Sequence, residues 1–168
     1  MATKPDQPAP SLSDDELLRV CRLLQQHQAR YVLVGACACG LHGLVRSTQD
    51  VDLLIESSPE NMQRVIDALS ELPDHAAREL TVKDLQENVV VKIADEIMVD
   101  VAKQAWTLDY EEAIKDAATL EVEGVRIIYA SLDALIKSKS TYRDQDRVDR
   151  QQLIWLKQKK ATEKHGAG

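Results

Sequence analysis

Apolar positions in the first third of the chain change period twice. Ser13-Asp-Asp-Glu16 reads as a capping box, and the apolar residues behind it keep helical spacing: Leu17, Leu18, Cys21 and Leu24. The run from Tyr31 to Val34 is continuously apolar, ends at Gly35, and predicts a short buried strand. We expect a short helix over 36–44 and a second strand over 51–55.

The rest of the chain mixes the same two patterns. Ser58-Pro59 supplies an N-cap and a first-turn proline for a helix. Two apolar runs, 89–94 and 97–102, flank Asp95-Glu96 and predict a hairpin with a two-residue turn. Segments 120–122 and 125–129 predict another pair of strands. Helices are expected over 110–117, 131–139 and 143–159, and the ambiguous stretch 75–87 has a short helix around 82–86.

This order of elements predicts an α+β fold, with a mixed β-sheet and helices packed on it. We expect one domain over 13–160, a disordered lead over 1–12 and a disordered tail over 161–168. The lead is rich in proline and polar residues and shows no apolar signal-peptide segment. No run of eighteen apolar residues occurs, so a transmembrane helix is not expected.

Composition adds two constraints. Cys21, Cys37 and Cys39 lack the second pair that a four-ligand zinc site needs, so we expect small core thiols in a cytoplasmic protein. The net charge of −7 disfavours non-specific nucleic-acid binding by the whole surface. Segment 137–164 nevertheless holds nine Lys or Arg against four Asp or Glu. A basic C-terminal helix either faces a polyanion or complements an acidic body.

Carboxylates interrupt two of the predicted strands. Asp50 and Asp52 point to one face at the start of the second strand, because side chains in a strand alternate. Asp100 interrupts the apolar run IMVDVAK, where an unpaired carboxylate is costly. If the two strands are neighbours, the three acids can hold Mg²⁺ ions for phosphoryl transfer. The alternative is that Asp-x-Asp only marks the exposed start of a strand.

The turn before these acids suits a phosphate. Gly35 and Ala36 close a strand and open a helix, where free backbone N–H groups attract an anion. Arg46, just before the acids, offers a bidentate contact to a phosphate. The alternative is an ordinary chain reversal.

Taken together, VGACACGLHGLVRSTQDVDLLI resembles the signature of the nucleotidyltransferase superfamily with the polymerase-beta-like minimal fold. The matching positions are Gly35, Gly43, Arg46, Thr48, Asp50 and Asp52, with Asp100 as the later strand acid. Downstream, SLDALIKSKSTYRDQDRVDRQQL resembles the C-terminal helices of small bacterial members, including the abortive-infection toxin-like group. The matching positions there are Lys139, Arg143, Asp146, Asp149 and Leu153.

The resemblance implies Mg²⁺-dependent transfer of a nucleoside monophosphate from a nucleoside triphosphate (NTP) to an unidentified acceptor hydroxyl. It implies that Asp50 and Asp52 ligate Mg²⁺, and that Asp100 ligates a metal and helps deprotonate the acceptor. The acceptor can be an RNA, a protein or a small molecule, and a homodimer or a protein partner is compatible with so short a chain.

The resemblance also implies a set of nucleotide contacts. The amides of Gly35 and Ala36 would hold the β- and γ-phosphates, and Lys139 with Arg46 would neutralise phosphate charge. Ala36 departs from the Gly or Ser that the family carries there, which weakens the expected nucleotide contact. Thr48 either contributes to this site or only fixes the loop, and Lys139 equally fits a solvated lysine at a helix end.

Two alternatives to the nucleotidyltransferase hypothesis stay open. In the first, the chain is a non-catalytic binding module or toxin–antitoxin component of the same fold. In the second, it is an unrelated acidic α/β domain. We interpret Arg143, Asp146 and Asp149 as an ion-pair network between helices. His42 is interpreted as a surface or half-buried helix residue, and Trp155 as a packing residue.

Overall fold

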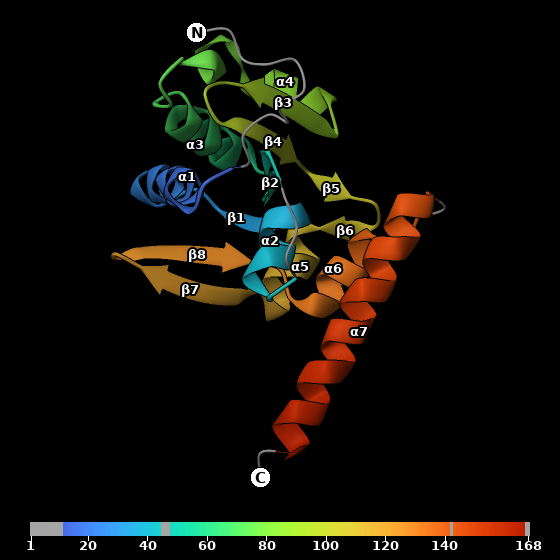
Figure 1. Ribbon diagram of the computed structural model, residues 1–168. Coiled ribbons are helices and arrows are strands. Elements are labelled where there is room, and N and C mark those ends of the chain that lie inside the picture. The colour runs from blue at the N-terminus through green and yellow to red at the C-terminus, as the bar shows by residue number, and fades with distance from the viewer. Residues whose placement is uncertain (1–11, 45–47, 142, 167–168) are drawn as a thin grey trace, which may run out of the picture.

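The computed structural model describes residues 12–44, 48–141 and 143–166 (Figure 1). Its helices are α1 (Asp14–Gln26), α2 (Gly35–Leu41), α3 (Pro59–Leu69), α4 (Val82–Glu87), α5 (Tyr110–Ala113), α6 (Leu132–Ser138) and α7 (Asp144–Gly166), with 3₁₀ turns η1 (Ala76–Glu79) and η2 (Ile114–Asp116). Its strands are β1 (Tyr31–Val34), β2 (Asp50–Ile55), β3 (Val90–Ala94), β4 (Met98–Ala102), β5 (Gln104–Ala105), β6 (Leu108–Asp109), β7 (Ala118–Val122) and β8 (Val125–Tyr129).

Six of these strands form one mixed sheet in the order β3-β4-β2-β1-β8-β7. The β2–β4 and β1–β8 pairs are parallel, and the β1–β2, β3–β4 and β7–β8 pairs are antiparallel. Strands β5 and β6 form a separate two-stranded hairpin. The predicted α+β class with a mixed sheet and packed helices is therefore confirmed.

Burial alternates along the central strands. Val51 and Leu53 of β2 and Val99 of β4 are fully buried, whereas the acids between them stay partly exposed. One face of the sheet at this end is therefore core, and the other is open to solvent. Helices α1 and α3 pack against each other beside the sheet, and α7 runs away from it, so that its C-terminal half projects (Figure 1).

The sequence predicts the local start signals well. The Ser13 hydroxyl accepts a hydrogen bond from the Glu16 amide, and the Glu16 carboxylate accepts one from the Ser13 amide, both at 3.1 Å. Ser58 caps α3 through the amide of Asn61 at 3.2 Å. Both predicted helix N-termini are confirmed.

Three features differ from expectation. The β3–β4 pairing closes at Ala94 and Met98, so the turn holds three residues, 95–97, in place of two. The β5–β6 hairpin and η1 are elements that the sequence patterns did not predict. Helix α7 continues to Gly166, past the expected end at 159, so the described part of the predicted tail is helical. The tail is polar, but Ala, Glu and Lys within it are good helix formers.

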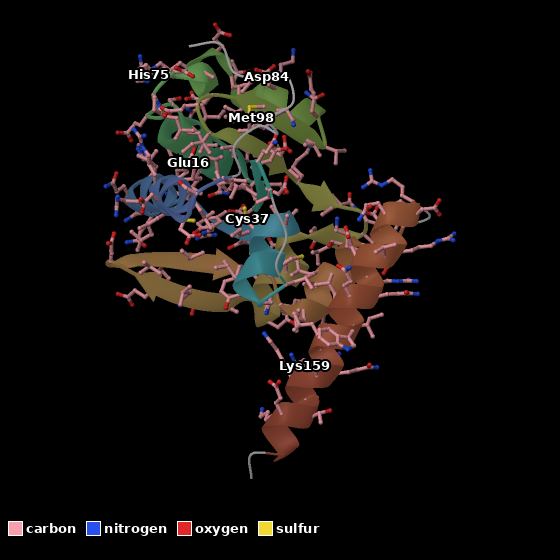
Figure 2. The ribbon with its side chains drawn as sticks, viewed as in Figure 1. Glu16, Cys37, His75, Asp84, Met98 and Lys159 are labelled. Atoms are coloured by element: carbon pink, nitrogen blue, oxygen red, sulfur yellow. The ribbon has the colours of Figure 1, made fainter. Side chains whose placement is uncertain are left out.

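The three cysteines are buried thiols, as predicted. Figure 2 shows Cys37 at α2, within the body of the protein. Burial raises the pKa of Cys21 to about 11 and that of Cys37 to about 12. These two thiols therefore stay protonated and serve as small core residues. In the described part of the chain, none of the helices is both long and apolar enough to cross a membrane.

Asp95 joins the β3–β4 turn to the segment around η1. Its side chain is 8% exposed and accepts hydrogen bonds from the amides of Asp74, Ala76 and Glu96 at 2.9, 3.0 and 2.8 Å. Burial opposes ionisation, but the three amides outweigh it and lower the pKa of Asp95. This carboxylate therefore ties two loops together through backbone groups.

We expect Asp95→Ala to lower the free energy of unfolding by about 1–3 kcal/mol, because partly buried amides lose their acceptor. Chemical denaturation measures this loss. Because the folded-state pKa lies below the usual 3.8, the stabilisation is present above that value and is lost as the pH falls through the folded-state pKa. The difference should therefore shrink in acid. Asp74→Ala, at an exposed neighbour, should change little; an equal loss in both variants would contradict the role of Asp95.

Candidate active site

Strand register brings the predicted acids together. Asp52 of β2 pairs with Asp100 of β4, and Asp50 lies two residues earlier on the same face of β2. The next pair across the sheet sets Lys92 of β3 opposite Asp100. On the other side, Val34 at the end of β1 lies opposite Asp52. Cross-strand partners share a face, so the charged side chains form one row across the open face of the sheet.

The carboxylates of this row repel one another. Burial first, then the charge of Asp100, a hydrogen bond with Asp100 and the charge of Asp50 raise the pKa of Asp52 to about 7, while the charge of Lys139 lowers it in part. Two neighbouring carboxylates in a partly dry site do not both ionise unless a cation lies nearby. The row therefore favours a nearby cation.

Lys92 supplies one cation to the row. Its Nζ lies 3.4 Å from Oδ2 of Asp50 and 3.7 Å from Oδ1 of Asp100. The charge of Asp100 first, and then the contacts with Asp50, raise the pKa of Lys92. Lys92 is not among the site residues predicted from the sequence. It interrupts the apolar run VVVKIA just as Asp100 interrupts its own strand, so the same signal was present.

The donor set fits a divalent cation by type, but it is not assembled around one. Mg²⁺ prefers oxygen ligands, and the buried Oδ1 of Asp100 accepts no hydrogen bond from the described residues. Across the described ranges, however, no three His, Cys, Asp or Glu side chains are grouped closely enough to hold a metal ion as placed. Binding would require the carboxylates to close up and the ammonium group of Lys92 to move aside.

Gly35 lies directly against the acids. It has φ +69°, a left-handed conformation that favours glycine, at the start of α2. A Cβ atom there would lie 2.1 Å from Oδ2 of Asp52, so any larger residue would force the two apart. The turn formed by Gly35 and Ala36 thus begins at the carboxylate row, and its glycine is required by both backbone conformation and space.

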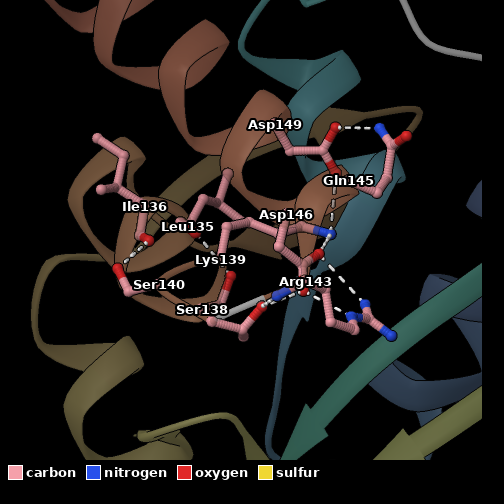
Figure 3. Close-up of polar contacts among 10 residues, drawn as sticks. Leu135, Ile136, Ser138, Lys139, Ser140, Arg143, Gln145, Asp146 and Asp149 are labelled. Atoms are coloured by element: carbon pink, nitrogen blue, oxygen red, sulfur yellow. Dashed lines mark hydrogen bonds and ion pairs between the residues drawn. The ribbon is translucent and has the colours of Figure 1, made fainter.

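Lys139 belongs to an ion-pair network at the junction of α6 and α7 (Figure 3). Its Nζ lies 3.4 Å from Oδ1 of Asp146 and 3.2 Å from Oδ2 of Asp149. The Arg143 Nε donates to Oδ2 of Asp146 at 2.8 Å, and this contact is the main reason why the pKa of Asp146 lies well below its usual range. The predicted ion pairing of Arg143 with Asp146 is present, but both residues lie at the start of α7, and it is Lys139, at the end of α6, that links the two helices through Asp146 and Asp149.

The structure describes the surroundings of Thr48 and His42 but not those of Arg46. Thr48 Oγ1 donates to the Asp50 carbonyl at 3.0 Å and accepts from the Asp50 amide at 3.3 Å, so it fixes the loop. His42 is half-buried, with Nε2 2.8 Å from the Ala130 carbonyl oxygen, and burial lowers its pKa. Arg46 lies outside the described residues.

The packing role predicted for Trp155 is wrong. Its side chain is 57% exposed on α7, and Lys159 Nζ lies 5.2 Å from its ring centroid. Leu153 and Leu156 occupy buried positions of this helix, so the helix does not need Trp155 for its packing. Figure 2 shows Lys159 on the projecting part of α7.

A cavity of about 640 Å³ opens beside the carboxylate row and is lined by two of its acids, Asp52 and Asp100. It is bounded by the β1–α2 turn, β2, β4, the β5–β6 hairpin and the α6–α7 junction, and its lining includes Gly35, Asp52, Asp100, Trp106, Lys139 and Arg143. This volume is within the usual range for small-molecule sites, about 300–1,000 Å³. The fold therefore brings the two sequence motifs, one early and one late in the chain, to a single hollow.

Comparison with known proteins identifies the fold. Neither a protein-family model nor a curated protein sequence matches this chain. Among solved structures, a candidate nucleotidyltransferase from Thermotoga maritima is similar, with TM-score 0.51, 17% identity, and coverage of 88% of this chain and 97% of that one. An antigenic nucleotidyltransferase-like protein from Paracoccidioides brasiliensis is also similar, with TM-score 0.52, 17% identity, and coverage of 88% and 78%. The chain has a nucleotidyltransferase-like fold.

Proposed function

We propose that this protein is a Mg²⁺-dependent nucleotidyltransferase that moves a nucleoside monophosphate from an NTP to an acceptor hydroxyl. The observation that carries the proposal is the row of Asp50, Asp52 and Asp100, which share one open face of the sheet beside Gly35. Clustered carboxylates beside a cavity suit a divalent cation, and the bound cation would in turn attract a triphosphate.

The three acids would act at the reacting phosphate. Asp50, Asp52 and Asp100 would hold Mg²⁺, which when bound neutralises phosphate charge and orients the reacting groups. The acceptor oxygen bonds to the α-phosphorus, the bond from that phosphorus to the β-phosphate bridging oxygen breaks, and pyrophosphate leaves. Asp100 accepts the proton of the acceptor hydroxyl.

The remaining contacts hold the triphosphate. The amides of Gly35 and Ala36 would bind the β- and γ-phosphates, because they lie at the start of α2 beside Asp52. Lys139 lines the same cavity and would neutralise phosphate charge, as would Arg46. Thr48 keeps the loop before the acids in shape. Catalysis would come mostly from positioning and charge neutralisation.

The acceptor belongs to one of three classes, which are an RNA, a protein and a small molecule. An RNA end would be attracted by the basic residues of α7, and Lys157, Lys159 and Lys160 are exposed there. A protein partner or a second copy of the chain would complete an acceptor site on so small a domain. Incubation with each labelled NTP and a cell extract, followed by fractionation, identifies which class gains label.

A second candidate function is a non-catalytic binding module or toxin–antitoxin component of the same fold. The contacts of Lys92 favour it, because an ammonium group already lies between Asp50 and Asp100. Ala36, in place of the Gly or Ser expected there, also favours it.

Asp52→Asn should lower the rate of NTP-dependent labelling at least about 100-fold, because the central carboxylate of the row is lost. Thermal shift with Mg²⁺ and each NTP provides a second readout. The wild type should gain stability only when metal and nucleotide are both present, and the variant should not. A metal-dependent nucleotide shift that is unchanged in the variant would contradict the proposed site.

The same substitution should stabilise the protein when chelator has removed divalent ions. A folded-state pKa of about 7 in place of 3.8 corresponds to a cost of up to about 4 kcal/mol at pH 8. Because this pKa is raised, the cost appears as the pH rises above 3.8 and is complete above about 7. Urea denaturation should therefore show the variant to be more stable at pH 8 and equal to the wild type near pH 4. Asp67→Asn, on the exposed face of α3, is the control; a variant less stable than the wild type at pH 8 would refute charge repulsion in the row.

Lys92→Gln should bind Mn²⁺ more tightly than the wild type, because a competing cation is removed from between two carboxylates. Electron paramagnetic resonance of free Mn²⁺ measures this affinity without any reaction. Lys83→Gln removes an exposed lysine whose ion pair is with Glu87, at 3.8 Å, and it should leave the affinity unchanged. Mn²⁺ binding by neither the wild type nor the Lys92 variant would favour the non-catalytic candidate.

A further inference from the structure

The cavity that contains the acids is lined by both polar and apolar side chains. Gly35, Asp52 and Lys139 are among its lining residues. Val89, Val90 and Trp106 line it too, with exposed fractions of 58%, 52% and 48%. Large, partly exposed apolar side chains that gather at one cavity indicate a ligand surface.

Trp106 occupies the tip of the tight β5–β6 turn. The pairing of Ala105 with Leu108 leaves only Trp106 and Thr107 between the strands. Trp106 has φ +58°, in the left-handed region where turns of this length favour Asn, Asp or Gly. A bulky aromatic residue is an unfavourable choice for making this turn. A strained backbone at the rim of a cavity points to a role for the side chain itself.

We propose that Trp106 is the platform on which the base of the NTP stacks, and that the site prefers purine nucleotides. This inference rests on the proposed function, since it needs the triphosphate at the Gly35 turn. A nucleotide held there by its phosphates keeps its base within the same cavity, which Trp106 also lines. Aromatic side chains stack on any base, and a purine offers the larger face.

The chain provides a matched control. It contains two tryptophans, Trp106 and Trp155. Trp155 lies on α7 beside a separate hollow lined by Leu44, Val148 and two glutamines. Both side chains are about half exposed, so they report solvent and ligand contact equally well. Only Trp106 lines the cavity of the acids.

The first experiment is tryptophan fluorescence with the Trp155→Phe chain, in which Trp106 is the only tryptophan. ATP with Mg²⁺ should change the fluorescence of this chain, whereas the Trp106→Phe chain, which retains Trp155, should show no change. A signal from Trp155 and none from Trp106 would overturn the inference.

The second experiment compares affinities by calorimetry. Trp106→Leu should weaken ATP binding about tenfold or more, because the base loses the ring on which it stacks. The ATP affinity of Trp106→Phe should lie between those of Trp106→Leu and the wild type. Inorganic tripolyphosphate with Mg²⁺ has no base, so its affinity should be the same in all three proteins. In the wild type ATP and GTP should bind more tightly than CTP and UTP, and the difference should narrow in the Leu variant. Trp155→Leu should bind all of these ligands as the wild type does.

Two outcomes would overturn this inference alone, and a third would overturn the proposed function as well. Equal affinity of the wild type and Trp106→Leu for ATP would remove the stacking role and leave the proposed function intact. Equal weakening of ATP and tripolyphosphate would show that Trp106 acts on the shape of the cavity. Binding of neither ATP nor tripolyphosphate by the wild type would refute the proposed function and this inference together.

Discussion

The pairing of β2 with β4 places Asp52 beside Asp100, and this forced approach of two carboxylates governs the rest of the site. Register leaves no choice, because a shift by one residue would turn Val51 and Val99 out of the core. Burial of the apolar face therefore fixes the acids on the open face. Burial first, and then repulsion from Asp100, raise the pKa of Asp52 to about 7, and this is a cost that the fold bears.

The residues around Asp52 and Asp100 either offset the charge of this pair or leave space for it. Lys92 approaches from β3 and Lys139 acts from the α6–α7 junction, so that cations stand on two sides of the row. Gly35 leaves room for the Asp52 carboxylate where any side chain would collide with it. Lys139 is itself positioned by Asp146 and Asp149, which ties the cavity wall to the long helix α7. A divalent cation would replace Lys92 as the counter-charge and would bring a triphosphate with it.

Sequence periodicity predicts most strands of the sheet and the positions of the three acids within them, whereas Lys139 enters only through the family resemblance. Alternation placed Asp50 and Asp52 on one face, and the interruption of an apolar run identified Asp100. The neighbour relation between β2 and β4 could not be read from the chain, because parallel pairing of distant strands leaves no local signal. Lys92 was missed although it interrupts its strand as Asp100 does. The β5–β6 hairpin was missed because Trp106 and Thr107 carry none of the usual turn chemistry. Trp155 was assigned to packing from helical spacing alone, which does not say where a helix leaves the body.

The central claim is that three carboxylates from two strands close on a shared divalent cation beside bound triphosphate. Diffraction from crystals grown with Mn²⁺ and a non-hydrolysable ATP analogue tests it most directly, because the anomalous signal locates the metal. We expect an anomalous peak of Mn²⁺ within coordination distance of Asp50, Asp52 and Asp100. The Lys92 ammonium group should be displaced, and the phosphates should lie against the Gly35 turn. A bound analogue whose metal lies away from these three carboxylates, with Lys92 still between Asp50 and Asp100, would contradict it.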